Sequence, residues 1–70
     1  MRIREIRESK NLSQLKLAQM TGLTQAFVCE LETGRKNPSI KSLAKVARAL
    51  DCSIDDLLSN EDREELALSQ

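Results

Sequence analysis

The sequence predicts an all-α domain, and three observations support this. The 70 residues include one Phe and no Trp or Tyr, so the core must be built from aliphatic side chains, which favours packed helices over a β-barrel. Apolar residues recur at helical spacing, and residues of the types that cap helices stand before the apolar stretches. The length allows one domain with a small core.

The strongest helical periodicity lies in residues 40–50. Apolar side chains at offsets 0, 3, 4, 7 and 10 predict one buried face. They are Ile40, Leu43, Ala44, Ala47 and Leu50. Ser39 precedes this helix as its N-cap, and Ser53 stands in the same position before a short fifth helix.

The first helix is expected over about residues 3–10, with Ile3 and Ile6 on its buried side. Asn11 ends this helix, and Leu12 anchors the connection to the next one. The pattern therefore indicates a short amphipathic helix that opens the domain.

Residues 14–33, QLKLAQMTGLTQAFVCELET, predict two short helices joined by a tight turn. Ser13 and Thr24 can cap these helices with their hydroxyl groups. Gly22 lies where the turn needs a left-handed backbone. This is the sequence form of a helix-turn-helix, whose second helix is shaped to enter a DNA major groove.

The two helices of this motif are expected at about 14–20 and 25–32, and each has a small buried face. The residues expected to face inward are Leu15, Leu17, Ala18, Leu23, Val28 and Leu31. An ordinary helical hairpin uses the same residue types singly. Their joint spacing, followed by a loop with Gly34 and Pro38, favours DNA binding.

The net charge of zero hides two opposite parts of the chain. Residues 1–50 contain ten Lys/Arg and four Asp/Glu, whereas residues 51–70 contain one Arg and seven Asp/Glu. The basic part suits a polyanion, and the acidic part is expected to point away from it. We therefore expect a domain over residues 1–58 and an acidic tail over 59–70, which either adds to a dimer interface as a helical turn or stays disordered.

Little in the sequence points to catalysis or to a bound metal or cofactor. There is no His, and Cys29 and Cys52 are too isolated for a zinc site. Asp55 and Asp56 suit the first turn of a helix, where carboxylates interact favourably with the dipole. Because the sequence has no long apolar run and no secretory signal, we expect a cytoplasmic, nucleoid-associated protein without membrane contact.

Residues 2–58 resemble the Cro/Xre family, the lambdoid-repressor type of helix-turn-helix domain. The stretches that carry the resemblance are LSQLKLAQMTGLTQ (12–25), ELETGRKNPS (30–39) and ALDCSIDDLL (49–58). It implies a compact five-helix, lambda-repressor-like domain whose helix-turn-helix is formed by the second and third helices. It also implies binding to DNA operators as a homodimer.

The resemblance implies which residues grip the DNA phosphates. Gln14 matches a glutamine that clamps a phosphate at the start of the second helix, where free backbone N–H groups also favour an anion. Lys16 stands where relatives commonly carry Glu, and it adds positive charge. Thr33 and the backbone of Gly34 and Arg35 match positions that grip a phosphate, and Lys36 adds charge. The expected phosphate contacts are thus Gln14, Lys16, Thr33, Arg35 and Lys36.

The first turn of the third helix is expected to read base edges. Gln25 can both donate to and accept from adenine, and Ala26 can contact a thymine methyl. Phe27 either touches the DNA or packs locally. Glu30 departs from the family pattern, and it either accepts from a cytosine amino group or pairs with a nearby cation. Thr24 completes the predicted set.

Two further expectations concern the fold and its assembly. By resemblance, Arg7 and Glu32 form an ion pair that ties the first helix to the end of the third. A homodimer is expected because one recognition helix covers too few base pairs for selectivity. Its candidate contacts are Ile54, Leu57 and Leu58.

The sequence thus predicts a non-enzymatic, sequence-specific transcription regulator, most often a repressor, that binds double-stranded DNA as a homodimer. The alternative is an antitoxin or accessory subunit that binds a protein partner through the acidic tail and uses DNA binding for autoregulation.

Overall fold

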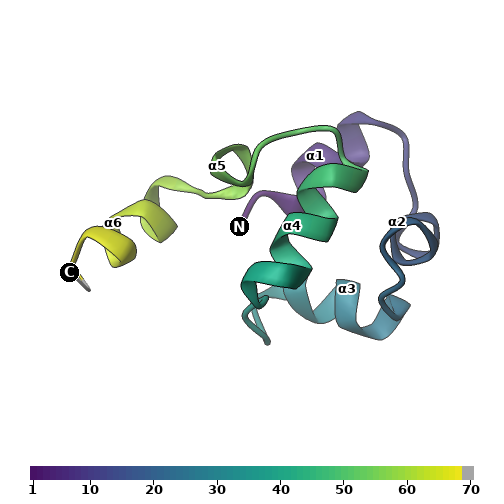
Figure 1. Cartoon of the computed structure of the whole chain (residues 1–70), viewed down its shortest axis with the longest axis horizontal. Coiled ribbons are helices and arrows are strands. Elements are labelled where there is room, and N and C mark those ends of the chain that lie inside the picture. Colours follow the sequence, from purple (N-terminus) through teal and green to yellow (C-terminus); the bar gives the residue numbers. More distant parts are fainter. Residues whose placement is uncertain (69–70) are drawn as a thin grey trace.

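The computed structural model describes the backbone of residues 1–68 and the side chains of residues 1–65, and it confirms the all-α class. Six helices make up this part of the chain (Figure 1): α1 Ile3–Ser9, α2 Gln14–Thr21, α3 Gln25–Thr33, α4 Ile40–Ala49, α5 Ile54–Leu57 and α6 Asn60–Leu68. The sixth helix exceeds the expected five because much of the acidic tail is helical. Residues 69 and 70 of that tail lie outside the described part.

The core is aliphatic and draws on each of α1 to α5. α2 packs against both α3 and α4, while α1 packs on α3 and α5 packs on α4. The buried apolar residues are Ile3, Leu17, Ala18, Val28, Leu31, Leu43, Val46, Ala47, Leu50 and Leu57. Burial of aliphatic side chains from five short helices is what holds a chain of this length together.

Every N-cap residue predicted from the sequence caps its helix in the structure. The hydroxyl groups of Ser13, Thr24 and Ser39 accept from backbone N–H groups three residues ahead, at 2.9–3.1 Å. Ser53 and Asp56 form a reciprocal capping box at the start of α5, with both bonds at 3.1 Å. These side chains satisfy N–H groups that have no acceptor within the helix.

Three residues predicted to face inward do not. Leu15 is 52% exposed and Ile40 77% exposed, and Ala44 is also exposed. In α2 the buried face is formed by Leu17, Ala18 and Thr21, and Leu15 lies outside this stripe. In α4 the buried face is formed by Leu43, Val46 and Ala47. Val46 was not predicted to be buried, and Ile40 lies outside this face in the exposed first turn.

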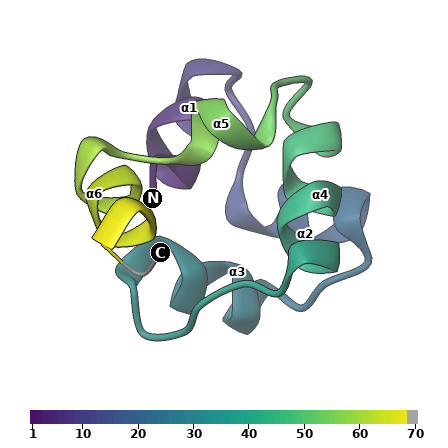
Figure 2. The same ribbon diagram turned by 60° about the vertical axis from the view of Figure 1, so that its left-hand side comes forward.

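The described molecule is elongated, with extents of 35 × 20 × 19 Å. Figure 1 shows α6 at one end of the long axis and α2 at the other, and the rotated view places α6 beside the N-terminus (Figure 2). Ser59 caps α6 together with Asp62, and Arg63 bonds the carbonyl and carboxylate of Asp55 at 3.1 Å. No helix within residues 1–68 combines the length and apolar character of a membrane span.

Candidate nucleic-acid interface

The turn between α2 and α3 sets the geometry of the helix-turn-helix. Gly22 has φ +74° directly after α2, a left-handed conformation that most residues adopt only with strain. Leu23 packs against the core, and its N–H lies 3.3 Å from the hydroxyl of buried Thr21. Thr24 then caps α3. The turn therefore fixes how α3 leaves α2 through backbone geometry as well as packing.

A buried ion pair lies beneath the start of α2. The guanidinium of Arg7 donates to both oxygens of Glu32 at 2.6 and 3.1 Å, and it also bonds the Leu12 carbonyl at 2.6 Å. The side chains of Arg7 and Glu32 are only 10% and 2% exposed. Arg7 thus joins α1 to the end of α3, as the family resemblance implied.

Gln14 belongs to the same network, a contact that the sequence did not predict. Its amide nitrogen donates to Oε1 of Glu32 at 2.9 Å, so the side chain is held at the first position of α2. Burial alone would raise the pKa of Glu32, but hydrogen bonds from Arg7 and Gln14 and the charge of Arg7 lower it below its ordinary value. Glu32 therefore stays ionised and keeps both partners in place at neutral pH.

The start of α2 has the features of an anion site. The Ser13 hydroxyl accepts from the Lys16 N–H. The first N–H groups of a helix, here those of Gln14 and Leu15, have no acceptor within it and attract anions. Lys16 is exposed nearby. The first turn of α2 thus contains free backbone N–H groups, the Gln14 amide and an exposed lysine.

The predicted base-reading residues do not share one environment. Thr24, Gln25 and Ala26 are exposed in the first turn of α3, together with Cys29 one turn later. Phe27 is half-buried and packs against the core, which matches the local packing role left open by the sequence. Gln25 is thus the long polar side chain available on this surface.

Glu30 pairs with a cation, one of the two roles considered for it. Its carboxylate lies 3.7 Å from the Lys36 amine, and both side chains are partly exposed. An acidic group on the recognition helix is therefore offset by a lysine of the following loop.

The loop after α3 does not offer the backbone donors of Gly34 and Arg35 that the family resemblance implied, because both N–H groups already bond carbonyls of α3. The N–H groups of Arg35 and Lys36 donate to the Glu30 carbonyl at 2.9 and 3.3 Å, and Gly34 has φ +78°. The Thr33 hydroxyl donates to the Cys29 and Glu30 carbonyls. Because these protons are used to end α3, a phosphate at this loop would be met by the exposed Arg35 and Lys36 side chains.

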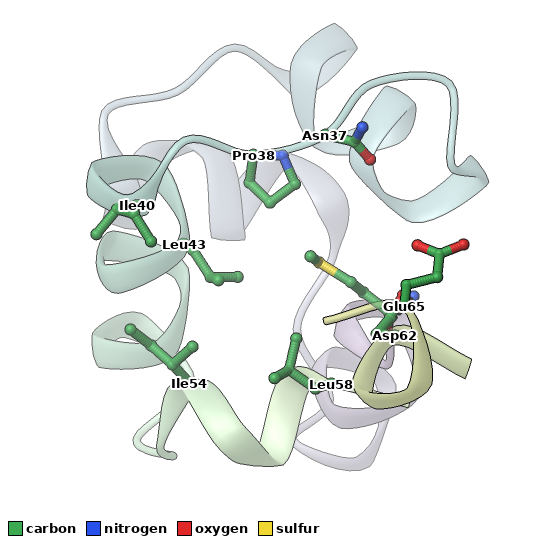
Figure 3. Close-up of a pocket in the computed structure, with 9 residues that line it drawn as sticks. Asn37, Pro38, Ile40, Leu43, Ile54, Leu58, Asp62 and Glu65 are labelled. Carbon is green, nitrogen blue, oxygen red and sulfur yellow. Dashed lines mark ion pairs between the residues drawn. The ribbon is translucent and has the colours of Figure 1, made fainter. Parts of the chain in front are cut away.

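Of the three predicted dimer contacts, one lies in the core and two lie at the surface. Leu57 is fully buried, so it supports the monomer and cannot present a contact surface; this part of the interface prediction is wrong. Ile54 is 37% exposed and Leu58 is partly exposed. Both line a groove of about 450 Å³ that also includes Pro38, Ile40 and Leu43 (Figure 3).

The two cysteines differ in environment. Cys29 is exposed on α3, whereas Cys52 is half-buried and packs against the core. Burial is the main reason that the pKa of the Cys52 thiol is raised, and the neighbouring Asp56 adds to the effect. Cys52 is therefore the less reactive thiol.

Comparison with known proteins supports this interpretation of the fold. A family model described as helix-turn-helix matches residues 3–57. A crystal structure of the restriction-modification controller protein C.AhdI from Aeromonas hydrophila superposes with a TM-score of 0.79 and 40% identity, covering 81% of this chain and 86% of that one.

Two relatives carry regulator names. An HTH-type transcriptional regulator of Archaeoglobus fulgidus is 36% identical over 63 residues, which are 90% of each chain. The immunity repressor protein of Bacillus phage phi105 is 33% identical over 60 residues, which are 86% of this chain but 42% of the repressor. The chain therefore belongs to the Cro/Xre-type helix-turn-helix family of DNA-binding transcription regulators.

Proposed function

We propose that this chain is a sequence-specific repressor that binds a palindromic operator as a homodimer. The observation that carries this proposal is the exposed first turn of α3, which presents Gln25 and Ala26 on a helix that two exposed basic segments precede and follow in the chain. One segment is the start of α2 with Lys16, and the other is the loop with Arg35 and Lys36. Phosphate contacts on both sides would fix the register of α3 in the major groove.

In this proposal Gln14 contacts a phosphate at the start of α2. Its amide nitrogen has a second N–H besides the one used by Glu32, and that proton is available to an anion. The backbone N–H groups of Gln14 and Leu15 add donors and the positive end of the helix dipole. Arg7 neutralises Glu32, so the buried carboxylate does not repel the phosphate.

Base reading is assigned mainly to Gln25, whose amide can pair with adenine through both a donor and an acceptor. Ala26 lies next to it and is small enough to approach a thymine methyl. The Glu30–Lys36 pair has a different role, because it keeps the carboxylate from facing DNA unneutralised.

We propose a homodimer because one recognition helix contacts too few base pairs for selective binding to an operator. Two recognition helices related by a two-fold axis and about 34 Å apart read half-sites on one face of DNA. The apolar groove supports self-association because Ile40 and Ile54 are exposed beside it and offer apolar surface that a second copy could cover. Ile54 and Leu58, together with Ile40, are the proposed contacts. Such a regulator would act in the cytoplasm, on the nucleoid.

The test is sequencing of the genomic fragments that the purified chain retains at about 0.15 M salt, the range in which specific and non-specific binding separate. Gln25→Ala is compared with Gln19→Ala, a matched control because Gln19 is exposed on α2 outside the proposed contacts. We expect a shared palindrome near a few promoters that Gln25→Ala alters and Gln19→Ala retains. Equal retention by all three proteins without a common motif would contradict the proposal.

A further inference from the structure

A second hollow lies between the end of α2 and the C-terminal half of α4, two helices that pack together (Figure 2). It measures about 400 Å³ and is lined by Met20, Thr21, Lys45, Arg48 and Ala49. None of these residues belongs to the proposed DNA contacts or to the proposed dimer contacts. The hollow is therefore separate from both of those surfaces.

The uncharged part of the lining is suited to apolar contact. Met20 is 46% exposed, and its flexible side chain can adapt to another surface. Ala49 beside it is half-buried. The hydroxyl proton of buried Thr21 is already used, because it bonds the carbonyls of Leu17 and Ala18 at 2.8 and 3.2 Å. These residues therefore offer a partner apolar surface rather than hydrogen-bond donors.

The charged part of the lining is entirely basic. Lys45 and Arg48 are exposed three residues apart on α4, and Lys41 continues the same face one turn earlier. None of these three cations forms an ion pair with a described acidic side chain. α2 and α4 contain no Asp or Glu of their own. The hollow thus presents positive charge that the described part of the chain does not neutralise.

DNA phosphate is one anion that such a surface attracts, but the hollow differs from the phosphate site at the start of α2. Anions bind preferentially where a helix begins, because its first N–H groups are free. This hollow lies where α2 ends and α4 approaches its end, and the free groups there are carbonyls. A phosphate also gains little from an exposed thioether. A protein segment can supply both carboxylates and an apolar side chain.

We propose that the hollow binds an acidic amphipathic helix of a protein partner. Its apolar side would cover Met20, and its carboxylates would pair with Lys45 and Arg48. The acidic helix α6 of the same chain cannot fill this role, because it lies at the opposite end of the 35 Å long axis from α2 (Figure 1). The partner would therefore bind a regulator whose DNA-contacting residues stay free.

The experiment is fluorescence anisotropy of labelled peptides with the full chain at about 0.15 M salt. The probes are synthetic amphipathic helices with glutamates on one face and leucines on the other, at several leucine spacings. Matched peptides replace either the glutamates by Gln or the leucines by Ser. The chain variants are Lys45→Glu, Arg48→Glu and Met20→Ser. Lys10→Glu and Gln19→Ser are controls, because both residues are exposed and neither lines the hollow.

We expect saturable binding of an acidic peptide by the wild-type chain. Each charge reversal should raise the peptide Kd by about 3- to 10-fold, since an attraction becomes a repulsion. Met20→Ser should raise it by a similar factor of about 3- to 10-fold through lost apolar contact. The two control variants should bind like wild type, and both altered peptides should bind more weakly. Thermal melts establish that every variant is folded.

Four results would overturn the proposal. Failure of the whole acidic peptide set to bind would show that the hollow is not a docking site. Equal binding by wild type and by the charge reversals would place the peptide elsewhere. Tighter peptide binding by Glu64→Lys would show that α6 of a second copy competes for the hollow. A greater loss of genomic-fragment retention in Lys45→Glu and Arg48→Glu than in Lys10→Glu would assign these cations to DNA, and retention is measured separately from peptide binding.

Discussion

Glu32→Ala is a substitution for which the structure predicts a loss of both stability and DNA binding. It removes a carboxylate that accepts three hydrogen bonds, two from Arg7 and one from Gln14. The Arg7 guanidinium keeps its bond to the Leu12 carbonyl but loses its counter-charge while remaining nearly buried. The variant thus leaves an uncompensated cation inside the domain.

The size of the expected loss in unfolding free energy follows from the burial of the Arg7–Glu32 ion pair. Breaking a buried ion pair by removal of one partner costs about 3–5 kcal/mol, and side chains that are 10% and 2% exposed belong to that class. We expect Glu32→Ala to lower the unfolding free energy by about 3 kcal/mol, the lower end of this range, because Arg7 retains the Leu12 carbonyl as an acceptor. For a domain of this size that corresponds to a Tm lower by about 12–24 °C.

The assay is thermal unfolding followed by circular dichroism, with Glu8→Ala as the matched control. Glu8 pairs with Arg4 at 2.7 Å, but the two side chains are 56% and 71% exposed. An exposed helical pair contributes only about 0.3–0.5 kcal/mol, so the control should shift Tm by about 1–4 °C. Equal Tm shifts in the two variants would refute the reasoning from burial.

A double variant separates stability from positioning. Arg7→Met/Glu32→Leu replaces the pair by apolar side chains, which is often neutral or stabilising for a buried ion pair. We expect it to recover most of the lost Tm. Gln14 still lacks its acceptor, so operator affinity should stay low. Recovery of full operator affinity would show that Glu32 does not position Gln14.

The same carboxylate makes stability depend on pH. The pKa of Glu32 is lower in the folded chain than in the unfolded one, so as pH falls the unfolded state binds the proton first. The stabilisation is therefore complete above the unfolded pKa of about 4.3 and is lost as pH falls through the folded value. Urea unfolding at several pH values should show this loss in wild type and a shallower dependence in Glu32→Ala.

Three other predictions concern single positions. Leu57→Ala should cost about 2–5 kcal/mol in urea unfolding because it opens a cavity in the core, whereas a cost below about 1 kcal/mol would place Leu57 at the surface instead. Gly22→Ala should cost about 1–2 kcal/mol from the positive φ alone, since no atom lies within 4 Å of an added Cβ; an unchanged Tm would contradict that geometry. A thiol reagent at pH 8 should label exposed Cys29 faster than Cys52, whose pKa is raised chiefly by burial, and mass spectrometry of timed samples would reveal the reverse order if this is wrong.

Local signals in the sequence predicted local structure well. Ser13, Thr24, Ser39 and Ser53 cap helices as expected, because capping depends on atoms three residues apart. The exposure of Ile40 could not be predicted in this way. It depends on where the core ends along α4, which is decided by how α2 and α5 pack there.

The candidate functional residues show the same limit of prediction from sequence. Family resemblance paired Arg7 with Glu32, but it did not show that Gln14 donates to that carboxylate. Nor could periodicity separate buried Leu57 from its neighbour Leu58 in a helix of four residues. Such distinctions arise from tertiary contacts between distant segments, for which a single sequence carries no direct signal.

The separation of charge along the molecule explains how a neutral chain can bind a polyanion. Electrostatic interactions in solution decay over about 8 Å at physiological ionic strength, whereas α2 and α6 lie at opposite ends of a molecule 35 Å long (Figure 1). A phosphate at α2 therefore experiences the nearby lysine and helix N–H groups much more strongly than the carboxylates of α6. The acidic end thus has little effect on the attraction of DNA, so that local charge, not net charge, governs this interface.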